Sequence, residues 1–149
     1  MSRAISPAAY QGLAEFRYQI RRFLIRAEQD ARSVGLEPQQ YLLLLAIRGL
    51  PAGTEPTIRN LAEHLQVRHH SAVELTDRLA RRGLVRRVRG KLDRRHVLVQ
   101  LTRRGEQVLA KLALRRLQEL RSSGPALVRT LKAIIARTKK PGASGRAGR

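Results

Sequence analysis

The sequence DRRHVLVQLTRRG, residues 93–105, decides the fold. From residue 96 to residue 101 polar and apolar side chains alternate with a period of two, and only Leu98 breaks the alternation. That period is typical of a β-strand with one buried face. Residues 84–89 also change from a helical period to a period of two, and the polar stretch 90–95 separates the two runs. We therefore expect a hairpin of two strands.

Two short helices separated by a tight turn are expected before the hairpin. Thr57 is a suitable N-cap for a helix over residues 58–65, whose apolar residues recur at helical spacing. Residues 66–68 break this helix, and a second helix follows over residues 69–82, with Gly83 as its C-terminal cap. This is the helix-turn-helix pattern, whose second helix enters the major groove of DNA, and a hairpin directly after it is a wing.

Longer helices are expected on both sides. Residues 7–34 form an amphipathic helix that Gly35 ends. Pro38 can occupy the first turn of a helix over residues 39–48. The centre of that helix, residues 41–47, is apolar nearly all round, so we expect it to be buried between other elements.

The chain after the hairpin is also helical in pattern. Thr102 can cap a helix that continues to about residue 121. Gly124 and Pro125 are expected to break it, and a last helix follows over residues 126–138. Residues 139–149 have no apolar period and are expected to form a disordered basic tail.

The charge of the chain indicates a polyanionic partner. Of 149 residues, 31 are Lys or Arg and 11 are Asp or Glu, a formal net charge of +20. A field of this sign attracts nucleic acid, although membrane lipid or RNA would be attracted too. Because aromatic residues make up only 3% of the sequence, few side chains are available to stack on single-stranded bases.

The sequence contains no cysteine, which excludes disulfides, thiolate metal sites and thiol redox switches. We find no signal-peptide pattern at the N-terminus and no apolar run long enough to span a membrane. A cytoplasmic, nucleoid-associated protein is therefore expected.

Several motifs, in the same order along the chain, resemble the MarR family of winged helix-turn-helix regulators. Asp93-x-Arg95 is followed by Val99-x-Leu101-Thr102-x-x-Gly105, which is similar to the wing signature of that family. Residues 79–85 resemble its junction between recognition helix and wing, and residues 36–45 with 58–65 resemble its second and third helices. The resemblance covers roughly residues 16–131.

The resemblance implies a mainly α-helical fold with a small β-hairpin wing (α+β). One domain would extend over residues 1–138, with the winged helix-turn-helix at 36–101. Residues 7–34 and 103–138 would be dimerisation helices. The implied function is a sequence-specific regulator, usually a repressor, that binds a pseudo-palindromic operator in double-stranded DNA as a homodimer.

Arg94 and Arg95 in the hairpin loop can place a guanidinium in the narrow minor groove of DNA. Asp93 can hold the Arg95 side chain in one rotamer through a charge-assisted hydrogen bond. By resemblance Arg95 is the minor-groove probe and Asp93 orients it. The alternative is that the two residues only close a polar turn.

The N-terminal half of the predicted recognition helix presents a polar face opposite its apolar one. The candidate DNA-binding residues on or just before this helix are Arg68, His69, His70, Ser71, Glu74 and Arg78. His and Ser can contact base edges or phosphates, and Glu74 can accept from a cytosine amine or be turned away from DNA. Each of these residues could also belong to a solvated helix face.

Neither a metal site nor an active site is expected. His64, His69 and His70 are close in sequence, but their spacing does not place them on one helical face with a carboxylate pair. No nucleophile with a base, no glycine-rich phosphate loop and no pair of acids indicates an enzyme or a cofactor.

A small aromatic anion is a possible effector. Arg17, Tyr18 and Arg21 on the first helix, with Tyr41 on the second, could offer cations and aromatic faces to it. The alternative is that these arginines are a solvated face and that no effector exists.

Two other function classes remain open from the sequence. A non-specific architectural nucleic-acid-binding protein would use the same charge and the basic tail. An RNA- or ribosome-associated protein is less favoured because aromatic residues are few.

Overall fold

The computed structural model describes residues 4–138. Within them the chain divides into two units: residues 27–116, and a second unit that contains residues 4–26 and 117–138. Each unit is described by itself. Residues 1–3 and the predicted basic tail, 139–149, lie outside the described residues.

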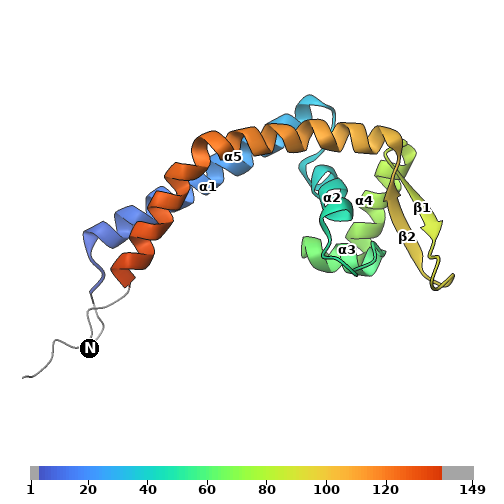
Figure 1. Ribbon diagram of the computed structural model, residues 1–149, viewed down its shortest axis with the longest axis horizontal. Coiled ribbons are helices and arrows are strands. Elements are labelled where there is room, and N and C mark those ends of the chain that lie inside the picture. The colour runs from blue at the N-terminus through green and yellow to red at the C-terminus, as the bar shows by residue number, and fades with distance from the viewer. Residues whose placement is uncertain (1–3, 139–149) are drawn as a thin grey trace, which may run out of the picture. The chain divides into compact units, whose positions relative to one another are not determined.

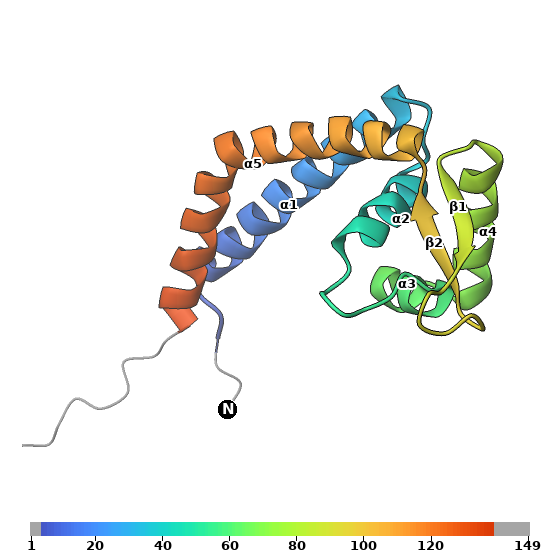
Figure 2. The same ribbon diagram turned by 45° about the vertical axis from the view of Figure 1, so that its right-hand side comes forward.

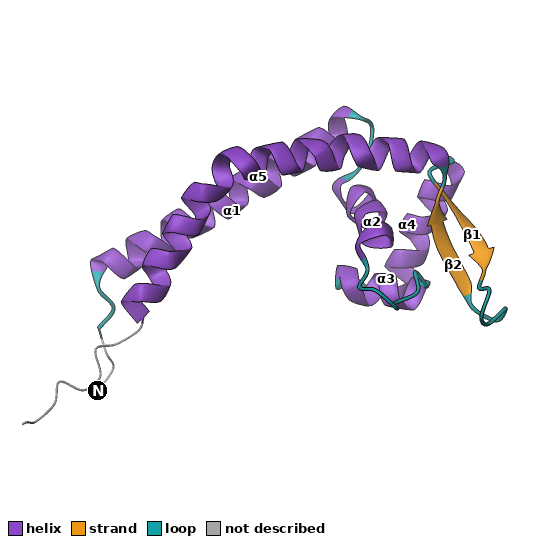
Figure 3. Ribbon diagram, viewed as in Figure 1, coloured by secondary structure: helices purple, strands orange, loops and turns teal. Residues whose placement is uncertain are grey.

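The elements are mainly helices with one hairpin, in the order expected from the sequence except that a single helix follows the hairpin where two were expected (Figures 1 and 3). The helices are α1 (Pro7–Ser33), α2 (Pro38–Gly49), α3 (Ile58–Leu65), α4 (His69–Arg81) and α5 (Arg103–Thr138). The strands are β1 (Val85–Arg89) and β2 (Val97–Leu101), which pair antiparallel with Arg87 opposite Val99.

The winged unit, residues 27–116, has an aliphatic core. Helices α2, α3 and α4 meet the hairpin around side chains that are almost fully buried, and β1 lies beside α4 (Figure 2). The largest of these core residues are Leu36, Leu43, Leu44, Leu61, Leu79, Val99 and Leu112. Burying an aliphatic side chain of this size contributes about 1.5–3 kcal/mol, so the core holds the helix-turn-helix against its wing.

The helix boundaries lie at the capping and breaking residues predicted from the sequence. Gly35 and Gly83 follow α1 and α4 with φ of 77° and 70°, a left-handed conformation that glycine adopts at low cost. The Thr57 side chain accepts a hydrogen bond from the Asn60 amide at the start of α3, and Pro38 occupies the first turn of α2.

The prediction that α2 is buried all round was wrong for two residues. Leu43, Leu44 and Ala46 are buried, whereas Leu42 and Leu45 are 41% and 40% exposed in the single chain. Residues three apart share one helical face, and the winged unit leaves that face of α2 uncovered.

The predicted break at Gly124 and Pro125 was also wrong, because α5 is continuous from Arg103 to Thr138. In the second unit, α1 and α5 lie side by side and antiparallel (Figures 1 and 2), so packing on both sides of Pro125 favours one helix over the loss of a single backbone hydrogen bond. The contacts that join them are Arg137 Nη1 to the Ala8 carbonyl (2.9 Å), Gln19 Nε2 to Thr130 Oγ1 (3.2 Å) and Arg26 Nη1 to Glu119 Oε1 (3.2 Å).

Candidate nucleic-acid interface

The turn between α3 and α4 is compact. Gln66 adopts a left-handed conformation with φ of 56°, and its amide caps α3 by donating to the carbonyls of Ala62 and Glu63. The next amide, that of Val67, also donates to the Ala62 carbonyl. This tight connection fixes where α4 begins and therefore which of its faces is exposed.

One face of α4 packs on the core and the opposite face is open to solvent. Ala72, Thr76 and Leu79 are buried, and the Thr76 hydroxyl donates to the Ala72 carbonyl at 2.7 Å. The predicted DNA-binding residues of this helix lie on the other side: Arg68, His69, His70, Glu74 and Arg78 are exposed and Ser71 is half-buried. Their exposure makes them accessible to a duplex.

Glu74 has a partner on its own helix. Its Oε1 lies 3.2 Å from Arg78 Nη2, one helical turn away. A carboxylate beside DNA is costly unless a donor neutralises it, and Arg78 is that donor in the free chain. The two predicted residues therefore form one local ion pair.

The wing loop is closed by its own backbone. Gly90 donates to the His96 carbonyl at 2.8 Å and His96 donates to the Asp93 carbonyl at 3.1 Å. A Cβ at Gly90 would lie 2.6 Å from the Asp93 carbonyl oxygen, so only glycine fits there. The loop therefore has a defined shape at the point where Arg94 and Arg95 are presented.

Asp93 holds Arg95 as the sequence suggested. Its Oδ1 accepts from Arg95 Nε and its Oδ2 from Arg95 Nη2, each at 3.2 Å, and the Arg95 backbone amide also donates to Oδ1 at 3.0 Å. The Arg95 side chain is nevertheless 89% exposed. These hydrogen bonds lower the pKa of the Asp93 carboxyl, so Asp93 stays charged and keeps an accessible guanidinium in place.

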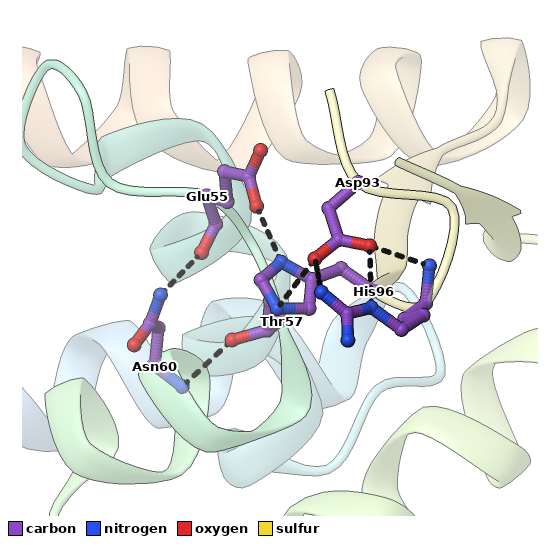
Figure 4. Close-up of polar contacts among 6 residues, drawn as sticks. Glu55, Thr57, Asn60, Asp93 and His96 are labelled. Carbon is purple, nitrogen blue, oxygen red and sulfur yellow. Dashed lines mark hydrogen bonds and ion pairs between the residues drawn. The ribbon is translucent and has the colours of Figure 1, made fainter. Parts of the chain in front are cut away.

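The hairpin is attached to the helix-turn-helix at several points that sequence reasoning missed. Arg87 of β1 pairs with Asp77 of α4, and the Val99 amide donates to the Pro56 carbonyl at 2.8 Å. Figure 4 shows a third attachment, His96 Nδ1 beside Glu55 Oε2 at 3.2 Å. These partners are 10 to 43 residues apart in the sequence, and no periodic pattern connects them.

The Thr102 and Gly105 positions of the wing signature have a structural reason. The Thr102 hydroxyl donates to the Gly83 carbonyl at 2.6 Å and accepts from the Gly105 amide, which caps α5. A Cβ at Gly105 would lie 2.0 Å from the Leu84 carbonyl oxygen. The signature thus joins the first turn of α5 to the end of α4.

The residues suggested for an effector are not gathered in one pocket of either unit. Tyr18, with Arg22 and Phe23, lines a cavity of about 160 Å³ between α1 and α5, and neither Arg17 nor Arg21 lines it. Tyr41 is buried in the winged unit. The four-residue effector site therefore stays a prediction.

Among residues 4–138, no cluster of three or more His, Cys, Asp or Glu side chains is placed to hold a metal ion. In the same part of the chain no helix is both long and apolar enough to cross a membrane.

Comparisons with known proteins agree with this geometry. Residues 34–96 match the sequence model of the MarR family. YhbI of Bacillus subtilis (strain 168), named as an uncharacterized HTH-type transcriptional regulator, is 33% identical over 97 residues. That alignment covers 62% of this chain and 61% of the relative, less than two thirds of the relative's length.

Solved structures share the fold. A MarR family protein from Bacillus stearothermophilus has a TM-score of 0.67 at 20% identity, with 92% of this chain and 100% of that chain covered. A variant of MepR from S. aureus, bound to an oligodeoxyribonucleotide, has a TM-score of 0.63 at 18% identity, with 85% and 96% covered. The winged helix-turn-helix, the wing signature and the match over residues 34–96 make this chain similar to the MarR family.

Proposed function

We propose that the chain is a transcriptional regulator that binds double-stranded DNA in a sequence-specific manner. The observation that carries this proposal is the pairing of an exposed polar face on α4 with an exposed guanidinium on the wing, Arg95, in one packed unit. In this arrangement α4 enters the major groove and Arg95 reaches the adjacent minor groove. A MepR variant with the same fold is bound to an oligodeoxyribonucleotide, which supports a DNA partner for this chain.

Arg68, His69, His70 and Ser71 are the proposed base and phosphate contacts of α4, because they occupy its N-cap and first turn. Glu74 and Arg78, one turn further along, would exchange their mutual ion pair for contacts to DNA. Arg94, beside Arg95, would contact phosphate.

We propose a homodimer as the binding species. The paired helices of the second unit expose many apolar side chains that a second copy would cover. They include Tyr10, Leu13, Leu24, Leu117, Val128, Leu131 and Ile135, all at least 41% exposed. A two-fold dimer presents two copies of α4, so its operator is expected to be a pseudo-palindrome, and binding at a promoter would repress transcription.

Selection from a random duplex pool, followed by fluorescence anisotropy at physiological salt, tests the proposal. A selected duplex should bind about 10³-fold or more tightly than random duplex, the ratio typical of specific regulators. A ratio near one would instead support the second candidate, a non-specific architectural protein, which the net charge of +20 also favours. Repression is tested separately with a reporter behind the selected site.

We further propose that a phenolic or aromatic carboxylate releases the DNA, with Arg17, Tyr18 and Arg21 of α1 as its contacts. A ligand can do this only if it binds the conformation that does not fit the operator more tightly than the one that does. Adding salicylate-type anions to the anisotropy titration should raise the dissociation constant. Mild peroxide should not raise it, because the sequence has no thiol.

A further inference from the structure

The imidazole of His96 lies between two carboxylates that come from different segments of the winged unit (Figure 4). Its Nδ1 is 3.2 Å from Oε2 of Glu55, in the loop before α3. Its Nε2 is 3.9 Å from Oδ2 of Asp93, in the wing loop. The ring therefore connects the wing loop to the helix-turn-helix.

Both Glu55 and Asp93 make further contacts. The Glu55 carbonyl accepts from Asn60 Nδ2 at 2.8 Å, and the Asn60 amide donates to Thr57 Oγ1 at 3.2 Å, which anchors Glu55 to the start of α3. Asp93 in turn accepts both hydrogen bonds from the Arg95 guanidinium. A continuous series of contacts thus runs from α3 through His96 to Arg95.

We propose that His96 is a positioning residue of the wing: its imidazole ties the Asp93–Arg95 pair to the α3 loop, and protonation of the ring strengthens this tie and tightens DNA binding. This inference rests on the proposed function, because it assigns a role in presenting Arg95 to DNA. It assigns His96 no contact with DNA.

The proton count gives the direction of the effect. A neutral imidazole has one N–H and no net charge, whereas a protonated ring has an N–H on both nitrogens and a positive charge that attracts both carboxylates. An imidazole ordinarily changes charge between about pH 5 and pH 8. Asp93 remains ionised over that range because Arg95 lowers the pKa of its carboxyl. Acidification should therefore tighten the tie.

Other charged groups near the ring do not reverse this direction. Arg59 and Glu63 of α3 line the same open cavity as Glu55 and His96. Arg95 donates to the same Asp93 carboxylate that lies beside the ring. The groups around the ring thus comprise the carboxylates of Glu55, Glu63 and Asp93 and the guanidinium groups of Arg59 and Arg95.

The first experiment measures the affinity for a selected duplex at about pH 6 and about pH 8, at constant ionic strength. Protonation of His69 and His70 on α4 would also tighten binding, so the informative quantity is the difference between variants. His96→Asn should reduce the ratio of the two affinities by about two- to fivefold per wing, the range for partly exposed ion pairs. His64→Asn, on α3, is the matched control and should keep the wild-type ratio.

Glu55→Gln separates positioning from direct contact with DNA. If His96 acts through Glu55, this variant should reduce the ratio as much as His96→Asn does, and the double variant should add nothing further. An unchanged ratio in His96→Asn would overturn the proposal. The proposal would also be overturned if His96→Asn reduced the ratio of the two affinities while Glu55→Gln kept the wild-type ratio, since the ring would then contact DNA itself.

A measurement without DNA distinguishes failure of this inference from failure of the proposed function. Backbone amide relaxation by NMR should show residues 90–96 of the free protein more ordered at about pH 6 than at about pH 8. The difference should disappear in Glu55→Gln and in His96→Asn. If the wild-type loop is equally ordered at both pH values, the positioning role of His96 is wrong even if DNA binding is sequence-specific.

Discussion

Arg87 Nη2 of β1 lies 2.6 Å from Asp77 Oδ1 of α4, so an ion pair joins the wing to the helix proposed to read DNA bases. Val99, opposite Arg87 in the hairpin, is fully buried in the core. The wing is therefore attached to the helix-turn-helix by both charge and apolar packing.

Alanine at either Asp77 or Arg87 should lower the free energy of unfolding by about 0.2–1 kcal/mol, because the pair is partly exposed. The double variant should lose less than the sum of the two single losses, since the first substitution already breaks the contact. Urea unfolding followed by circular dichroism measures this cycle. Strictly additive losses would mean that the contact contributes no coupling.

Arg95→Ala should weaken operator binding by about 1–3 kcal/mol per half-site while leaving the unfolding free energy unchanged, because the side chain is 89% exposed and makes no core contact. Anisotropy titrations at several salt concentrations measure both the affinity and its salt slope. Arg94→Ala is the matched control, expected to weaken all duplexes alike. Unchanged affinity and salt slope in Arg95→Ala would leave Asp93 and Arg95 as a polar turn only.

Gly105→Ala should destabilise the winged unit by about 1–3 kcal/mol or more, since the new Cβ would lie 2.0 Å from the Leu84 carbonyl oxygen and the backbone would have to move. Gly124→Ala is the control on the same helix, where a Cβ meets nothing within 4 Å. It should stabilise α5 by up to about 1 kcal/mol. Thermal unfolding of both variants checks the pair, and equal effects would contradict the close approach at Gly105.

Tyr41→Phe should make stability less dependent on pH in alkaline solution. Burial raises the pKa of the Tyr41 phenol, and Arg116 opposes part of that shift. The contribution of Tyr41 is therefore fully present below the ordinary tyrosine pKa of about 10 and is lost as pH rises through the higher folded value. Unfolding free energies from about pH 7 to about pH 11 should fall less steeply in Tyr41→Phe. If the unfolding free energy fell equally steeply with pH in wild type and Tyr41→Phe, the phenol would be exposed to solvent.

Light scattering should give about twice the chain mass of 16.8 kDa, because a second copy is proposed to cover the exposed apolar side chains of α1 and α5. Leu117, at 64% exposure, is a sensitive site. Leu117→Asp should shift the protein toward monomer, whereas Gln118→Asp adds the same charge at an exposed polar position and should remain dimeric. A wild-type monomer that binds its operator tightly would contradict the dimer.

Most of the fold could be predicted because its determinants are local. The Thr57 cap, Gly35 and Gly83 act within a few residues of the boundaries they set, and the periods of the apolar residues distinguish helices from strands. The contact between Asp93 and Arg95 was predictable for the same reason, since two residues separate them along one short loop.

The sequence by itself determined the winged helix-turn-helix, the exposed face of α4 and the wing arginine, because each depends on interactions between near neighbours in the chain. Only the tertiary structure decided that α5 continues through Pro125, since that outcome depends on packing against α1. It also decided the partners of Arg87 and His96, which come from other elements. Such contacts form only when the core brings distant segments together, and no periodicity in the sequence encodes them.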